Sequence, residues 1–143
     1  MSRREVAPAV ENPELAIRAH YSDYGTHPLD GPEPLRFPAD WRMSTSWRRP
    51  QEKETTVNPV NDAEYMVQVG DGDIHRTTAV VQNGTLCCDC DCRGWTNRRF
   101  CAHVSAIWWR WCRSQTFITD RDAGRTLRRP PAWLSVEDQE VGQ

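Results

Sequence analysis

The stretch that decides the fold is CCDCDCRGWTNRRFCAH, residues 87–103, which holds five of the six cysteines in the chain. Cys90 and Cys92 form a C-x-C pair, and Cys101 and His103 form a C-x-H pair after eight intervening residues. This spacing lets the chain fold back and bring both pairs to one point. Three thiolates and one imidazole suit a closed tetrahedral site, and zinc is the common cellular metal that fits such a site best. The sequence therefore predicts one structural zinc ion bound by these four side chains.

The pattern C-x-C, eight residues, C-x-H resembles the SWIM zinc finger. In that family the first pair ends a β-hairpin, an aromatic residue follows a few positions later, and the second pair opens a helix. Here Trp95 follows Cys92 by three residues, and an apolar helical run begins at Cys101. The resemblance covers residues 64–113. SWIM domains occur in transposases, chromatin remodellers and recombination accessory proteins, so the resemblance implies a role in a DNA-associated process.

The additional cysteines leave alternatives open. A shifted ligand set is Cys88, Cys90, Cys101 and His103. The position of Trp95 favours Cys90 and Cys92 over this set, and no role is assigned to Cys87, Cys88 or Cys112. A disulfide framework is disfavoured because the N-terminal residues carry no apolar segment of a signal peptide, and we expect an intracellular, cytoplasmic location.

Composition indicates a small core that needs a metal ion. The chain has 143 residues, of which 38% are hydrophobic, and ten are proline. It has no apolar run long enough to cross a membrane, so we expect no membrane partner. A structural zinc ion contributes on the order of 10 kcal/mol to folding, which is large beside the stability of a small core. We therefore expect zinc to decide whether the central module folds.

Three strands are predicted before the second ligand pair. The first covers residues 65–69, the second 74–82 and the third 85–90, which carries the first ligands. Asp71-Gly72 and Asn83-Gly84 are strong turn signals between them, and the second suits the positive φ angles of a tight hairpin. The fold class is therefore a small α+β arrangement, in which zinc staples a three-strand meander to one following helix.

That helix is predicted from Cys101 to about Ser114. Val104, Ile107, Trp108 and Trp111 recur at helical spacing and form one apolar face, which we expect to cover the hairpin. The thiolate of Cys101 at the helix start would be stabilised by free N–H groups and the positive end of the helix dipole.

The rest of the chain is divided by composition. We expect a disordered tail at 1–11, a helix within 12–25 that starts at Asn12-Pro13, and a proline-rich linker or arm at 26–63. Trp41 and Trp47 in that arm are expected to anchor it on the folded part.

The zinc module is expected to span residues 64–114. Residues 115–143 form a basic and then acidic tail, with a short edge strand at 116–119 and a short docking motif, intramolecular or not, at Trp133-Leu134.

Positive charge is concentrated around the zinc ligands. Nine of the 18 Lys and Arg residues lie within 93–129, where only two acidic residues occur. Arg93, Arg98 and Arg99, with Trp95 as a stacking plane, suit a phosphate backbone with unstacked bases. The alternative interpretation is that these arginines neutralise the thiolates and the neighbouring Asp89 and Asp91.

Two functions follow, neither of them enzymatic. The first is a zinc-binding module that mediates DNA or RNA binding. The second is a protein-interaction adaptor that uses exposed tryptophans and the proline-rich arm. We expect no catalytic residues and no small-molecule substrate, because four protein ligands leave zinc no open position and no carboxylate pair, nucleophile elbow or phosphate loop is present.

Overall fold

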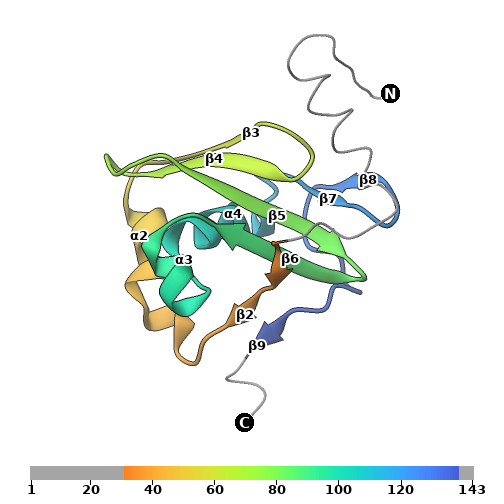
Figure 1. Ribbon diagram of the computed structural model, residues 1–143, viewed down its shortest axis with the longest axis horizontal. Coiled ribbons are helices and arrows are strands. Elements are labelled where there is room, and N and C mark those ends of the chain that lie inside the picture. Colours follow the sequence, from red (N-terminus) through yellow and green to blue (C-terminus); the bar gives the residue numbers. More distant parts are fainter. Residues whose placement is uncertain (1–30, 139–143) are drawn as a thin grey trace.

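The computed structural model describes residues 31–138, which form a small α+β unit with a mixed sheet and three α-helices (Figure 1). The strands are β1 (Glu33–Pro34), β2 (Arg36–Phe37), β3 (Thr55–Pro59), β4 (Glu64–Val69), β5 (His75–Gln82), β6 (Thr85–Cys90), β7 (Ile118–Asp120), β8 (Arg125–Leu127) and β9 (Glu137–Asp138). The helices are α2 (Thr45–Glu52), α3 (Arg93–Arg98) and α4 (Ala102–Cys112), and a short 3-10 helix, η1 (Trp41–Met43), precedes α2.

The main sheet has seven strands. Its path is β1-β6-β5-β4-β3, with all neighbours antiparallel, and β7 pairs in parallel with β5 and antiparallel with β8. Strands β2 and β9 form a separate parallel pair. The predicted α+β class is therefore confirmed, and the sheet extends well beyond the predicted meander.

Strands β4, β5 and β6 form the predicted meander. Tyr65, Val67 and Val69 are buried while the residues between them are only half-buried, as expected for a strand with one face on the core. Asn83 and Gly84 both have positive φ, 55° and 74°, which is the geometry that the Asn-Gly pair predicted for the hairpin turn.

Helix α4 packs on β4, β5 and β6. Val104, Ile107 and Trp111 are each at most 2% exposed, so the predicted apolar stripe does cover the sheet. The indole Nε1 of Trp111 donates a hydrogen bond of 2.9 Å to the carbonyl of Leu127, which ties α4 to β8. Trp108 is only half-buried, and its ring packs edge-on against Phe37.

Residues 31–63 belong to the same core, although their proline-rich composition suggested a linker or arm. Leu35, Phe37 and Trp41 are nearly fully buried in the main cluster. The backbone N–H of Leu35 donates to the carbonyl of Leu86, 2.9 Å away, which continues the pairing beside β6. The predicted anchors are in place, since the rings of Trp41 and Trp47 lie 4.7 Å apart and both pack on this cluster.

Helix α2 and strand β3 were not expected from the sequence. The side chain of Ser44 caps α2 by accepting the N–H of Trp47 at 3.2 Å, and serine is a common residue at the start of a helix. Pro50 lies inside α2, and a proline at that position argues against a helix when only the sequence is considered. Strand β3 begins with the β-branched run 55–57, and all five of its residues pair with β4. The sheet therefore begins before residue 64, where the zinc module was expected to start.

A strand is present near the expected edge strand at 116–119, as β7 at Ile118–Asp120, but it is not an edge strand because it pairs with both β5 and β8. The carbonyl of Phe117, the residue before β7, accepts a hydrogen bond of 2.6 Å from the hydroxyl of Tyr65.

The predicted tail at 1–11, the predicted helix within 12–25 and the linker residues before 31 lie outside the described residues. Within residues 31–138, none of the helices has the length and apolar character required to cross a membrane.

Replacing Leu35 with alanine tests whether residues 31–63 unfold together with the sheet. Its side chain is 1% exposed, so the truncation leaves a cavity and is expected to lower the free energy of unfolding by about 2–5 kcal/mol. Met43→Ala is the control because Met43 is 76% exposed, and its effect should stay within about 0.5 kcal/mol. Urea unfolding followed by circular dichroism measures both, and an unchanged Leu35→Ala midpoint would contradict a shared core.

Candidate metal centre

Four side chains from three consecutive elements converge at one point. Cys90 ends β6, Cys92 precedes α3, Cys101 precedes α4, and His103 lies in the first turn of α4. One potential ligand atom from each residue lies within 4.8 Å of the others. The three cysteines are buried and His103 is half-buried. These are the four residues that the spacing predicted, and such a donor set suits one tetrahedral zinc ion.

The remaining cysteines lie elsewhere. Cys88 is 1% exposed, sits within the core cluster and is not part of the four-residue group, so the shifted ligand set is not assembled. Cys87 packs with Val80 and Ala63 in a separate cluster, and Cys112 is exposed near the end of α4. Burial raises the pKa of the Cys87 and Cys88 thiols. All six cysteines are free, so the structure contains none of the disulfides weighed above.

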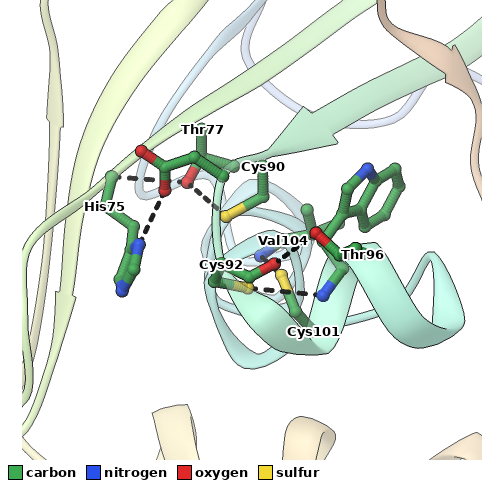
Figure 2. A network of polar contacts seen from close by, with 9 residues as sticks. His75, Thr77, Cys90, Cys92, Thr96, Cys101 and Val104 are labelled. Carbon is green, nitrogen blue, oxygen red and sulfur yellow. Dashed lines mark hydrogen bonds and ion pairs between the residues drawn. The ribbon is translucent and has the colours of Figure 1, made fainter.

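Two of the ligand cysteines cap helices. The Cys92 sulfur accepts the N–H of Trp95 at the start of α3, and the Cys101 sulfur accepts the N–H of Val104 at the start of α4, each at 3.4 Å (Figure 2). Helix N-termini carry free N–H groups and partial positive charge, which favour a thiolate over a thiol. The cap predicted for Cys101 is therefore present, and Cys92 has the same kind of cap on a helix that was not predicted.

The other two ligands are also prepared for a metal ion. The hydroxyl of Thr77 on β5 lies 3.5 Å from the sulfur of Cys90, within hydrogen-bond reach (Figure 2). Nδ1 of His103 is buried and has no hydrogen-bond partner among the described residues. A buried nitrogen without a partner is costly, and a metal ion at the cluster would relieve that cost. The donor set therefore fits zinc.

The three clustered thiols share protons through hydrogen bonds. Hydrogen bonds from Cys101 and Cys90 lower the pKa of Cys92. The same sharing of protons with Cys90 and Cys92 raises the pKa of Cys101. One negative charge opposes the next in such a cluster, whereas a divalent cation stabilises all three thiolates and displaces the remaining protons.

Gly94 is a site residue that sequence reasoning missed. A Cβ atom at this position would lie 3.3 Å from Cβ of Cys101 and 3.9 Å from the sulfur of Cys92. Glycine therefore allows α3 to pass close to two of the ligands. The sequence signal that could have identified Gly94 is its position between the two ligand pairs.

Of the four residues expected to contact nucleic acid, the structure buries one and exposes three. Trp95 is 1% exposed and packs in the main core, so it offers no stacking face, and that part of the prediction is wrong. The reason is α3, which turns Trp95 inward against the core. Arg93, Arg98 and Arg99 are exposed on α3 and its C-cap.

Serine substitutions should separate ligands from other cysteines. Cys92→Ser removes one of four donors and should lower zinc content below one ion per chain or weaken zinc binding by at least about tenfold. Cys88→Ser should keep one zinc ion, although it places a polar group in the core and is expected to lower thermal stability. Metal analysis and a competitive chelator titration measure both. Zinc loss in Cys88→Ser with full retention in Cys92→Ser would contradict the assigned ligand set.

Comparison with known families matches residues 65–109 to the SWIM zinc finger. The matched range begins in β4 and ends in α4, so it contains the meander, α3 and all four clustered residues. Comparisons with curated proteins and with solved structures gave no match. Residues 65–109 of this chain therefore match the SWIM zinc finger, and their cluster of three cysteines and one histidine is consistent with one structural zinc ion.

Proposed function

We propose that the zinc ion staples the hairpin end of β6 to α3 and α4, and that the stapled unit binds the phosphate backbone of a nucleic acid through the arginines around α3. The binding is electrostatic, because Trp95 is not available for stacking. In this proposal the ligand is DNA or RNA, and the contacts carry little sequence preference because they do not reach base edges.

The state of the arginines around α3 carries this proposal. Arg93 and Arg98 are exposed, and neither forms an ion pair with a carboxylate in the part of the chain that the structure describes. Arg98 instead reaches the hydroxyl of Ser46 on α2 at 3.4 Å. Arginines without carboxylate partners are available for phosphate, which a guanidinium can bind in a bidentate manner.

Local charge balance explains these arginines less well. Asp91, which lies between two ligands, pairs with His75 rather than with an arginine. Arg99 does pair with Glu33 at 3.1 Å, but both side chains are about half exposed, and such a surface pair contributes little. A phosphate can therefore compete with Glu33 for Arg99 at small cost.

We propose further that the module is not an enzyme. Three thiolates and one imidazole fill the four positions of a structural zinc ion and leave no place for a reactive water molecule. The sulfurs are buried and accept hydrogen bonds from the backbone, an arrangement that supports a structural ion.

The adaptor function has less support. Trp41, one of its proposed contacts, is 6% exposed, and the described part of the proline-rich segment packs on the chain's own core. Trp133, which is 49% exposed next to Pro130-Pro131, is the residue that still favours a protein partner. A Trp133→Ala variant that loses a partner while keeping nucleic-acid binding would support this second function.

Replacing Arg93, Arg98 and Arg99 together with glutamine should weaken binding to nucleic acids of unrelated sequence alike. Each lost phosphate contact should reduce the salt dependence of binding by roughly one released counterion. Fluorescence anisotropy with duplex and single-stranded oligonucleotides over a range of salt concentrations measures both quantities. Zinc content should remain one ion per chain, because none of the three residues is a ligand.

The control for this variant is the replacement of Arg125, Arg128 and Arg129, which removes the same charge from the other arginine-rich segment. An equal loss in both variants would show that only net charge matters and would contradict a site at α3. Absence of salt-sensitive binding in the unmodified chain would reject the nucleic-acid function altogether.

Trp95→Ala should act on stability rather than on base stacking. The side chain is buried beside the zinc ligands, so its truncation is expected to cost about 3–5 kcal/mol of unfolding free energy. Thermal unfolding of the zinc-loaded protein measures this effect. A variant with normal stability but selectively weakened single-strand binding would contradict the burial of Trp95 and would restore the stacking hypothesis.

A further inference from the structure

His75 lies against the zinc site without being one of its ligands. Its ring centroid is 4.4 Å from that of His103, with the two planes inclined by 52°. His103 is the least buried of the four clustered residues, although its Nδ1 atom is itself buried. Among the described residues, no other aromatic ring contacts His103. The ring of His75 therefore covers part of the least buried residue of the site.

A hydrogen bond joins His75 to the segment that holds the first two ligands. Nδ1 of His75 lies 2.6 Å from Oδ1 of Asp91, which is the single residue between Cys90 and Cys92. The strand register explains this contact, since Thr77 pairs with Cys90 and His75 lies two residues earlier, at the start of β5 and beside the C-x-C turn. Figure 2 shows His75 and Thr77 on the same side of the cysteine cluster.

We propose that His75 is a positioning residue of the zinc site that slows the release of the metal ion. Its hydrogen bond holds Asp91 and thereby the turn between Cys90 and Cys92, while its ring restrains His103. Zinc leaves a four-ligand site by successive loss of ligands, and His103 is the least buried residue of the four. Partners outside the ligand set commonly change metal affinity by about 10–100-fold, so a measurable effect is expected.

The test is the rate of zinc transfer from the full chain to a chromogenic chelator, measured by stopped-flow absorbance. His75→Ala and Asp91→Ala should each release zinc faster, with His75→Ala at least about tenfold faster than the unmodified chain. His75→Phe keeps a ring against His103 but lacks the hydrogen bond, so its rate should lie between those of His75→Ala and the unmodified chain. Cobalt-loaded His75→Ala should also show altered d–d absorption bands, because the geometry of the ligands changes.

Arg76→Ala is the matched control. Arg76 is the next residue on β5, is exposed and forms its own ion pair with Glu64 at 2.8 Å, so its loss perturbs the strand without touching the zinc site. Its release rate and cobalt spectrum should be unchanged. Equal release rates in His75→Ala and Arg76→Ala would overturn the proposal. Release as fast in His75→Phe as in His75→Ala would overturn the covering role, and an unchanged rate in Asp91→Ala would overturn the role of the hydrogen bond. If His75→Ala fails to fold, the Phe and Asp91 variants still decide between these outcomes.

Discussion

The convergence of Cys90, Cys92, Cys101 and His103, a cluster that fits one structural zinc ion, is the constraint around which the finger is arranged. These residues occupy the end of β6 and the starts of α3 and α4, so a bound ion would join three elements that also pack together through the apolar core. Two of the sulfurs also replace the usual side-chain oxygens at the helix N-termini. Metal binding and helix initiation are therefore served by the same atoms.

The finger is completed by residues on both sides of it. Leu35 and Phe37 enter the same core from before the finger, and Leu127 accepts the indole N–H of Trp111 after it. Strand β3 adds its full length to the edge of β4. This wider core is larger than composition suggested, so zinc organises one corner of the unit while apolar burial over the whole sheet supplies further stability.

Local signals made the finger predictable. Asn83-Gly84 predicted a tight turn, the β-branched residues before it predicted a strand, and the cysteine spacing allowed a common ligand point. The arrangement around these signals was harder to predict because it depends on contacts between distant residues. The parallel pairing of β5 with β7 leaves no local pattern, and Pro50 conceals α2.

The orientation of Trp95 shows the same limit at the site itself. A tryptophan among arginines is compatible with exposure or burial, and the choice depends on α3, whose start is set by Cys92. The contact between His75 and Asp91 was closer to being predictable. The tight turn at Asn83-Gly84 fixes the register of β5 with β6, and that register places His75 beside the C-x-C turn.

The most direct test of this account is the amide NMR spectrum of the full chain, recorded before and after removal of zinc by a chelator under reducing conditions. We predict that one zinc ion leaves per chain and that amide signals from 90–104, which span the ligands and both helix starts, lose their native positions. Readdition of zinc should restore them. A zinc-free spectrum that superimposes on the loaded one throughout this range would contradict the central claim that the ion holds α3 and α4 on the sheet.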